Sequence, residues 1–590
     1  MKRTSAGTLG TEQIGQRVKL QGWVHRRRDH GGVIFLDVRD RSGLAQVVVR
    51  PEEYEDAMKA LDPARIEWVV EVVGTVSARA PEAVNDKIPT GQIEVVAEEA
   101  KVLAASDPVP FGAGSDVESG EETRLRYRYI DLRREELQRN LMLRHRITTE
   151  TMNYLDEHGF LNVETPILTR STPEGARDYL VPSRVHKGEF FALPQSPQIF
   201  KQILMVSGFE RYVQIARCFR DEDLRLDRQP EFTQIDLEMS FIDEEEIYEL
   251  IEGLFVRLFA HANIEVKTPF RRIPYAEAML RYGSDSPDLR VDLEILDLSA
   301  TLEGSSFRAF EQVLATGGTI RGFRIPGAAE ASRKQVDKWA EVAQRYGAQG
   351  VLPVRQVEGE TRFQVKNVLS DDQLTTLRTD LALEDGDLGL IVAGSPKVAA
   401  ASLGALRVHI ARERGLMRED DHEFLWVTDF PAVEWNPDED RWDALHHPFT
   451  APRDEDVELL GSDPGKVKAR AYDVVLNGFE MGGGSIRIHR REVQSKMFEV
   501  LGIDAEEAQE RFGFLLEALS YGAPPHGGIA LGLDRLIMLM TGAASLRDVI
   551  AFPKTASATC LMTEAPSTVA PDQIQELGIR LSRPPGAAES

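Results

Sequence analysis

Apolar and polar residues alternate from Arg211 to Phe241, which predicts two strands joined by a charged loop. In the second strand one face is apolar and the other polar: Ile235, Leu237, Met239 and Phe241 against Gln234, Asp236 and Glu238. Such a hairpin can present its polar face to a polar ligand. Taken by itself, the pattern fits an ordinary amphipathic hairpin with a solvated loop equally well.

The first 105 residues have the alternation of a small β domain. A turn is expected at 29–32 and a short helix at 52–59, between the third and fourth of five strands. This order is typical of the OB fold, which often binds single-stranded nucleic acid. The predicted strands begin at Val18, Val33 and Leu44 and cover 66–78 and 92–103.

After the β domain, apolar residues recur at the spacing of an α-helix. One amphipathic helix is expected at 141–158, and a second at 197–208 with Ser196 as its cap. Gln198 and Lys201 lie on the first turns of the second helix, where the helix dipole favours an anion. A solvated lysine is the alternative interpretation of Lys201.

The second half of the chain contains a segment of mixed helix and strand patterns, followed by two segments marked by glycines. Residues 288–415 alternate between helix and strand patterns without a catalytic constellation. A strand marked by three consecutive glycines is expected at 471–489. Farther on, a strand ending at Leu531 precedes an apolar helix with Arg535 in its first turn.

Composition narrows the class of protein. A length of 590 residues accommodates about three or four domains, and 42% hydrophobic residues permit a large core. No apolar run reaches the roughly 18 residues of a membrane span, and the N-terminus lacks a signal-peptide core. The two cysteines favour a reducing cytoplasm and are expected to be buried. A net charge of −26 argues against general nucleic-acid binding and confines it to local basic patches.

Several charged residues are candidates for phosphate and metal chemistry. Arg220 is a forked, permanent cation suited to phosphate oxygens, and Arg487 is suited to a carboxylate. Asp473 and Glu480 are carboxylates that could hold Mg²⁺ between phosphates. A metal site made of two neighbouring histidines is not expected at His446, because adjacent side chains point apart on regular elements.

Three segments together resemble the motifs of class II aminoacyl-tRNA synthetases. The hairpin resembles motif 2 at Arg220-Asp221-Glu222, the stretch around Pro166 resembles motif 1, and Gly532-Leu533-Asp534-Arg535 resembles motif 3. Gln195-Ser196-Pro197-Gln198 with Lys201 is similar to the amino-acid signature of aspartyl-tRNA synthetases. The insertion at 288–415 resembles the one in bacterial members. The resemblance covers nearly the whole chain.

The resemblance implies a two-step reaction. The aspartate carboxylate attacks the α-phosphorus of ATP, and the aspartyl group then passes to the 3′ end of tRNA(Asp). Arg220, Glu222 and Arg535 would act catalytically, and Asp473 and Glu480 would bind Mg²⁺. The implied ATP contacts are Arg220, Asp221, Glu222, Gln229, Phe232, Glu480, Gly532, Leu533, Asp534 and Arg535. The implied aspartate contacts are Glu174, Ser196, Gln198, Lys201, Arg220, Asp236, His446 and Arg487.

The OB-like domain would bind the anticodon through Arg26, Arg28, His30, Phe35 and Gln46. From the residues alone, Phe35 is expected in the core; the resemblance makes it a platform for a base. Family members that charge only tRNA(Asp) often have leucine at the position of His30. Histidine resembles members that also charge tRNA(Asn), whose product an amidotransferase partner converts. An ordinary polar turn residue is the alternative interpretation.

The expected architecture is α+β with several domains. It comprises an OB barrel (1–105), a hinge (106–140), a catalytic domain in two parts (141–287 and 416–561), the insertion (288–415) and a C-terminal extension (562–590). The catalytic domain is expected to hold a six-stranded antiparallel sheet flanked by helices. The arginine-rich stretch at 124–140 could be a solvated helix or lie against tRNA.

The resemblance also implies a cytoplasmic homodimer without membrane contact. The alternatives are an asparaginyl- or lysyl-tRNA synthetase on the same scaffold, a non-catalytic tRNA-binding paralogue, and an aspartate–ammonia ligase. The insertion and the set of Gln198, Lys201 and Arg487 argue against the first. The intact motifs argue against the second, and the OB-like domain argues against the third.

Overall fold

The computed structural model describes residues 1–114, 119–171, 176–222 and 228–582. These divide into two compact units. The first contains the described residues of 1–146, 223–230 and 537–590, and the second those of 147–222 and 231–536.

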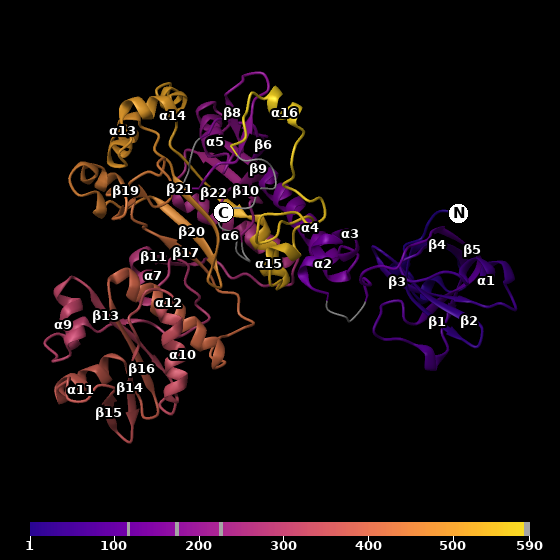
Figure 1. Cartoon of the computed structure of the whole chain (residues 1–590), viewed down its shortest axis with the longest axis horizontal. Helices are drawn as coiled ribbons and strands as arrows, with labels where there is room; N and C mark the ends of the chain where they lie inside the picture. Colours follow the sequence, from indigo (N-terminus) through magenta and orange to yellow (C-terminus); the bar gives the residue numbers. More distant parts are fainter. Residues whose placement is uncertain (115–118, 172–175, 223–227, 583–590) are drawn as a thin grey trace. The chain divides into compact units, whose positions relative to one another are not determined.

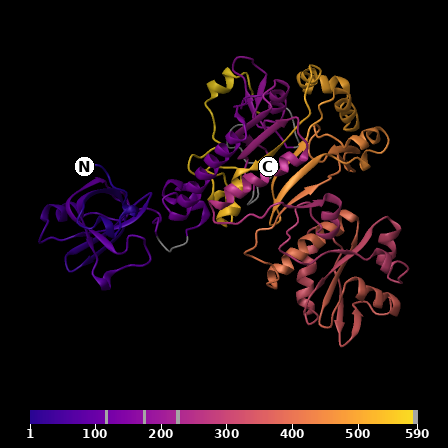
Figure 2. The ribbon, with the colours of Figure 1, turned by 180° about the vertical axis from the view of Figure 1, so that it is seen from behind.

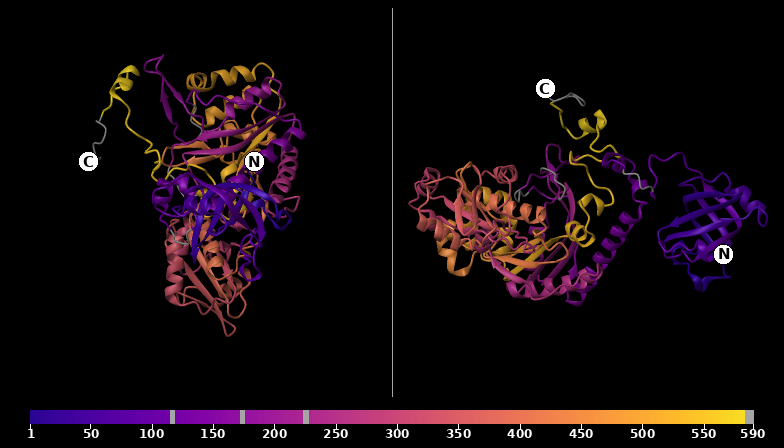
Figure 3. Two further views of the ribbon diagram at one scale, coloured as in Figure 1. Left: turned by 90° about the vertical axis from the view of Figure 1, so that its right-hand side faces the viewer. Right: turned by 90° about the horizontal axis from the view of Figure 1, so that it is seen from below.

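The first unit contains the predicted barrel. Five strands close in the order β1-β2-β3-β5-β4 (Figure 3, indigo), which confirms the OB fold. Valines and leucines such as Val24, Leu36 and Val72 fill its interior and are inaccessible to solvent. The elements are β1 (Arg17–His30), β2 (Val33–Asp40), β3 (Gly43–Val49), α1 (Glu55–Leu61), β4 (Val69–Ala78) and β5 (Ile93–Ala104).

The turn between β1 and β2 is shorter than predicted. Asp29 and His30 belong to β1, and only Gly31 and Gly32 turn the chain, with φ of 62° and 87°. Two consecutive residues with positive φ make a tight hairpin turn. The pairing of β1 with β2 also shifts register between Val24 and Arg26.

The arginine-rich stretch after the barrel is partly packed, although Arg126 and Arg139 are exposed. It forms α2 (Glu121–Arg126), α3 (Arg128–Asp131) and the start of α4 (Glu135–Glu157). Arg128 is buried, pairs with Asp131 at 2.6 Å and donates to the carbonyl groups of Arg547, Ile550 and Ala551. These contacts satisfy its guanidinium inside the protein, so Arg128 is not available to tRNA.

An eight-stranded sheet forms the centre of the second unit, in the order β11-β17-β20-β21-β22-β10-β9-β6 (Figure 1). The six strands from β17 to β9 pair antiparallel, as expected. The two edge strands, β11 and β6, pair parallel and were not predicted. The strands are β6 (Leu161–Asn162), β9 (Arg211–Phe219), β10 (Glu231–Ser240), β11 (Arg271–Pro274), β17 (Phe424–Thr428), β20 (Ala471–Leu476), β21 (Phe479–Ile486) and β22 (His526–Gly532).

The glycine-marked strand predicted at 471–489 is in fact a hairpin. Asn477 and Gly478, with φ of 54° and 84°, separate β20 from β21. Asn-Gly is the strongest short hairpin signal. The pairing also contains a register shift, because Val474 opposes Gly482 while Val475 opposes Glu480.

Helices flank this sheet. α6 lies across the face seen in Figure 2, and its Tyr248 contacts the rings of Trp426 and Tyr472 on the strands. The helices of this part are α5 (Gln198–Val206), α6 (Glu244–Ala260), α7 (Tyr275–Arg281), α13 (Arg491–Val500) and α14 (Ala505–Leu519). Helix α15 (Leu533–Thr541) begins in this unit and continues into the first.

The inserted segment forms its own sheet, in the order β12-β13-β16-β14-β15. α10 and α12 share one apolar core with this sheet, through Trp339 and Leu403, and α9 and α11 share a second, through Phe310 and Leu377. The elements are β12 (Leu296–Asp297), α9 (Arg308–Ala315), β13 (Thr319–Ile325), α10 (Arg333–Gln344), β14 (Leu352–Val357), β15 (Glu360–Phe363), α11 (Asp371–Asp380), β16 (Leu388–Gly394) and α12 (Pro396–Glu413).

The structure also contains two small hairpins and two further short helices: β7 (Leu180–Pro182) with β8 (Phe190–Ala192), β18 (Val433–Asn436) with β19 (Arg441–Ala444), α8 (Ser299–Leu302) and α16 (Pro571–Glu576). Both cysteines are buried, as predicted. In the described part of the chain, no helix has the length and apolar character needed to cross a membrane.

Candidate active site

The polar face of the central sheet forms the floor of a cavity of about 420 Å³. Asp473, Gly483, Ala530 and Asp236 oppose one another in a single row across β20, β21, β22 and β10. The two residues in the middle of the row have little or no side chain, whereas both ends carry carboxylates. The polar face of the hairpin thus contributes Gln234 and Asp236 to the lining of this cavity.

The neighbouring row of the sheet holds Glu238, for which no role was predicted. Glu238 opposes Gly528, which in turn opposes Ser485. A Cβ atom on Gly528 would lie 2.1 Å from Glu238 Oε2, so this glycine leaves room for the carboxylate. Glu238 could have been predicted to face the cavity, because it lies two residues after Asp236 on the same face of the strand.

Lys201 and Arg487 converge on these two carboxylates. Lys201 Nζ lies 2.7 Å from Asp236 Oδ1 and 3.3 Å from Glu238 Oε2. Arg487 donates to Glu238 from Nε at 2.9 Å and from Nη2 at 3.1 Å. The protein itself thus supplies two buried carboxylate partners for these cations.

The two carboxylates differ in their ionisation. Burial raises the pKa of Glu238, but the charges of Arg487 and Lys201 outweigh it and hold the pKa below its ordinary value. Burial also raises the pKa of Asp236, and there the attraction of Lys201 does not outweigh it. Asp236 Oδ2 is buried and has no hydrogen-bond partner among the described residues. Glu238 thus carries the firm negative charge of the cluster.

Two adjacent histidines line the same cavity in different states. Burial lowers the pKa of His446, but the Asp473 carboxylate, 3.3 Å away, outweighs it and raises the pKa above the usual value. Burial and the charge of Arg487 hold the pKa of His447 well below its ordinary range. The neutral His447 ring accepts a 2.6 Å hydrogen bond from Arg487 at Nε2. His447 was not among the predicted contacts.

The predicted metal ligands converge above a glycine. A Cβ atom on Gly483 would lie 2.6 Å from Asp473 Oδ1 and 3.5 Å from Glu480 Oε1. The charge of Asp473, together with burial, raises the pKa of Glu480 to about 7. The described residues contain no cluster of three or more metal-ligating side chains. Two carboxylates without a full protein cage fit Mg²⁺, which usually completes its coordination with phosphates and water.

The predicted nucleotide contacts divide into two groups. The guanidinium of Arg220 lies 5.2 Å from the ring centre of Phe232, and Arg535 contacts the backbone carbonyl of Glu480. Asp534, by contrast, is buried and accepts from the backbone N–H of Thr233 at 2.7 Å, which ties α15 to the hairpin. The side chain of Leu533 is buried, so only its backbone can face a ligand.

Only some of the remaining predicted ATP and aspartate contacts line this cavity. Gln229 belongs to the first unit, where its amide pairs with the backbone of Lys554 at 2.8 and 3.2 Å. Ser196 and Gln198 line the cavity, and the Ser196 hydroxyl accepts from the Gln198 N–H at 3.3 Å. Helix α5 starts at Gln198, one residue later than predicted. Asp221 and Glu222 follow β9, Gly532 ends β22, and Glu174 lies outside the described residues.

The predicted anticodon residues share one face of the barrel. Paired positions across β1, β2 and β3 place Arg26 with Asp37 and Gln46, and Arg28 with Phe35. Phe35 is half-buried on the outer face, not in the core, and its ring centre lies 6.0 Å from that of His30. Arg28 donates to Gln46 at 3.1 Å.

Comparisons with known proteins agree with this architecture. The family described as tRNA synthetases class II (D, K and N) matches residues 120–556, and the OB-fold nucleic acid binding domain matches 18–103. The asparaginyl-tRNA synthetase of Pyrococcus horikoshii, solved with asparaginyl-adenylate, has the same fold. Its TM-score is 0.59 at 18% identity, over 94% of this chain and 98% of that one.

Two curated relatives are much more similar in sequence. The aspartate–tRNA(Asp/Asn) ligase of Heliobacterium modesticaldum is 53% identical over 98% of this chain and 96% of its own length. The aspartate–tRNA ligase of Geobacillus kaustophilus is 52% identical over 99% of this chain and 100% of its own length. With a family match over most of the chain and relatives more than half identical throughout, this protein belongs to the class II tRNA synthetases of the D, K and N group.

Proposed function

We propose that this protein is an aspartate–tRNA ligase that activates L-aspartate with ATP and transfers it to tRNA. The observation that carries the proposal is the buried cluster of Lys201, Arg487, Asp236 and Glu238 beside the nucleotide hairpin. Two cations approach the cavity from different elements. A carboxylate side chain accepts from both, whereas the amide nitrogen of asparagine would meet a second donor.

The aspartate side-chain carboxylate would take the place of one hydrogen-bond acceptor that Arg487 already has. Arg487 has five N–H groups, and its hydrogen bonds go to Glu238, Ser485, His447 and the Gly528 carbonyl. Of these acceptors, His447 is the one that lines the cavity. We therefore assign His447 the position that the substrate carboxylate takes over, and His446 a contact beside it.

Activation needs positioning and charge neutralisation more than acid–base chemistry. The α-carboxylate oxygen bonds to the α-phosphorus while the bond to pyrophosphate breaks in line. Arg220 would stabilise charge on the α-phosphate, and Arg535 would hold the outer phosphates. Phe232 would stack on adenine, with Glu222 and Gln229 as polar contacts. Asp473 and Glu480 would hold Mg²⁺, which neutralises phosphate charge when bound.

Transfer to tRNA completes the reaction, with the OB barrel as the anticodon reader. A second candidate function is charging of both tRNA(Asp) and tRNA(Asn). The observation that favours it is the shared face of His30 and Phe35, because a residue beside a stacking platform can act on base choice. In that case an amidotransferase would convert the product on tRNA(Asn).

We further propose a cytoplasmic homodimer. Large apolar side chains are exposed around the segment that resembles motif 1, which would build the interface: Leu161, Ile167, Leu168, Leu180, Val185 and Phe190. Two free cysteines fit a reducing compartment.

Aspartate charging of purified tRNA(Asp) and tRNA(Asn) transcripts by one enzyme preparation tests both functions. Charging of tRNA(Asp) alone supports the first and makes His30 a structural residue. Comparable charging of both supports the second. If neither is charged while control enzymes are active, the proposed function is wrong.

A further inference from the structure

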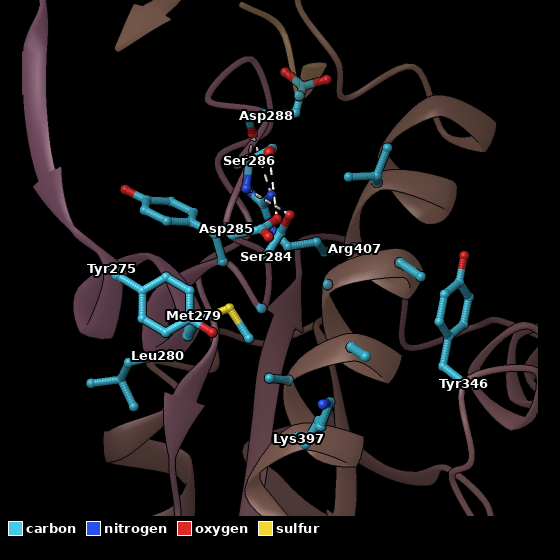
Figure 4. A pocket seen from close by; sticks show the side chains of 18 of the residues that line it. Tyr275, Met279, Leu280, Ser284, Asp285, Ser286, Asp288, Tyr346, Lys397 and Arg407 are labelled. Carbon is cyan, nitrogen blue, oxygen red and sulfur yellow. Dashed lines mark hydrogen bonds between the residues drawn. The ribbon is translucent and has the colours of Figure 1, made fainter. Parts of the chain in front are cut away.

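The loop at 282–288 forms a wall shared by two cavities. Asp285 lines the cavity described above and also a larger one of about 920 Å³ between α7 and α12. Figure 4 shows Ser284, Asp285 and Ser286 between the side chains of α7 and helix α12, which carries Arg407 and Lys397. The inserted segment therefore reaches the loop that borders the substrate cavity.

Arg407 of α12 holds the chain just after this loop. Its side chain is fully buried and donates to the carbonyl oxygens of Val291 at 2.6 Å, Leu293 at 2.7 Å and Asp288 at 3.3 Å. Its guanidinium also lies 5.2 Å from the ring centre of Tyr282. A buried guanidinium whose donors all meet backbone carbonyls fixes the path of that backbone.

Gly404 of α12 and Gly283 of the loop form a second contact between the helix and the loop. A Cβ atom on Gly404 of α12 would lie 2.5 Å from the Gly283 carbonyl oxygen. One on Gly283 would lie 2.2 Å from the Ala400 carbonyl oxygen. The helix and the loop are thus in direct backbone contact, and the loop cannot move toward α12.

The far side of the loop meets the hairpin that carries the metal-binding carboxylates. A Cβ atom on Gly478, in the turn between β20 and β21, would lie 3.1 Å from the Cβ of Asp288. Asp285 is exposed and lines the same cavity as Asp473 and Glu480. Its carboxylate therefore borders the space in which those two residues would hold a cation.

We propose that α12 of the inserted segment, through Arg407 and the Gly283–Gly404 contact, positions Asp285 in the cavity wall, where its carboxylate favours cation-complexed ATP. Arg407 is then a positioning residue, and the inserted segment supports the activation step. This inference rests on the proposed function, because it assumes ATP in the cavity.

The test compares Asp285→Asn, Arg407→Lys and the double variant with the wild type. Two measurements are made: aspartate-dependent ATP–pyrophosphate exchange, and Mn²⁺ binding with and without ATP by paramagnetic titration. We expect Asp285→Asn to raise the KM for Mg–ATP and weaken Mn²⁺ binding about fivefold or more, with the KM for aspartate nearly unchanged. Arg407→Lys should do the same, and the double variant should be no worse than Asp285→Asn.

Controls separate this outcome from general damage. Asp292→Asn and Arg412→Lys make the same substitutions at exposed positions nearby and should behave as wild type. If Arg407→Lys does not fold, Gly404→Ala tests the same contact. Wild-type Mn²⁺ affinity and Mg–ATP KM in Asp285→Asn, or additive losses in the double variant, would overturn the inference. An inactive wild type would instead contradict the proposed function.

Discussion

Glu238 holds the guanidinium of Arg487 by two hydrogen bonds, 2.9 Å from Nε and 3.1 Å from Nη2, and neither side chain is more than 3% exposed. This pair joins β10 to the end of β21 at the floor of the cavity. The cation that we propose binds the substrate carboxylate is thus already oriented by the protein, which reduces the free energy needed to order it.

Removal of Arg487 should affect both activity and stability. Arg487→Ala leaves the buried Glu238 with Lys201 alone, so we expect a loss of about 3–5 kcal/mol in the free energy of unfolding. Aspartate-dependent exchange should be abolished. The double variant Arg487→Ala/Glu238→Ala should recover part of the stability in urea denaturation but no activity. Near-normal exchange in Arg487→Ala would remove this residue from the aspartate site.

The pKa of Glu480 predicts how Mg²⁺ use depends on pH. Its pKa of about 7 exceeds the ordinary value of 4.5, so the folded protein keeps this proton up to a higher pH than the unfolded chain does. The contribution of Glu480 to folding stability therefore falls between pH 4.5 and 7, and above 7 the carboxylate is free to bind a cation. The Mg²⁺ concentration for half-maximal exchange should fall from pH 6 to pH 8.

Glu480→Gln is the matched variant for this prediction. It should raise the melting temperature at pH 8 but have little effect near pH 4.5, and it should flatten the pH dependence of Mg²⁺ use. An unchanged pH profile in this variant would assign the dependence to another group.

Gly483→Ala tests whether the space between the two carboxylates is used. The new methyl group would lie 2.6 Å from Asp473 Oδ1, so the carboxylate must rotate away while the backbone keeps its pairing. We expect a fall in exchange of about tenfold or more, with a nearly unchanged unfolding midpoint. Gly461→Ala, where a Cβ atom would meet nothing within 4 Å, is the control. Full activity of Gly483→Ala would place the metal elsewhere.

Phe35 should contribute to tRNA binding and not to activation. Loss of one stacking platform costs about 1–3 kcal/mol per base, so Phe35→Ala should raise the KM for tRNA about tenfold. ATP–pyrophosphate exchange without tRNA should stay at the wild-type level. Tyr521→Ala removes another exposed ring and serves as the control. A normal KM for tRNA would assign Phe35 to the packing of the barrel surface.

The exposed apolar residues near motif 1 predict the oligomeric state. The wild type should sediment as a dimer at micromolar concentration, and Leu168→Glu with Phe190→Glu should shift it toward monomer, because charges would be buried in the interface. Val569→Glu, at a similarly exposed valine outside this segment, should leave the dimer intact. A monomeric wild type would contradict the homodimer.

Much of the candidate site could be predicted from local patterns. The alternation at 211–241 predicted β9 and β10, and the alternation in the first 105 residues predicted the barrel. Apolar and polar residues alternate because one face of a strand is buried, and this alternation can be seen in a single sequence. The motif residues were found by their resemblance to a known family, which a single sequence can show because each motif is contiguous in the chain.

The partners of those residues depended on the tertiary structure. Alternation would place Glu480 and Arg487 on opposite faces, because they are seven residues apart. The register shift in β21 brings both to the cavity, and a similar shift in β1 turns Arg26 and Arg28 to the outer face of the barrel. A bulge is decided by pairing with a neighbouring strand. The pairing of Glu238 with Arg487, 249 residues apart, likewise required the folded sheet.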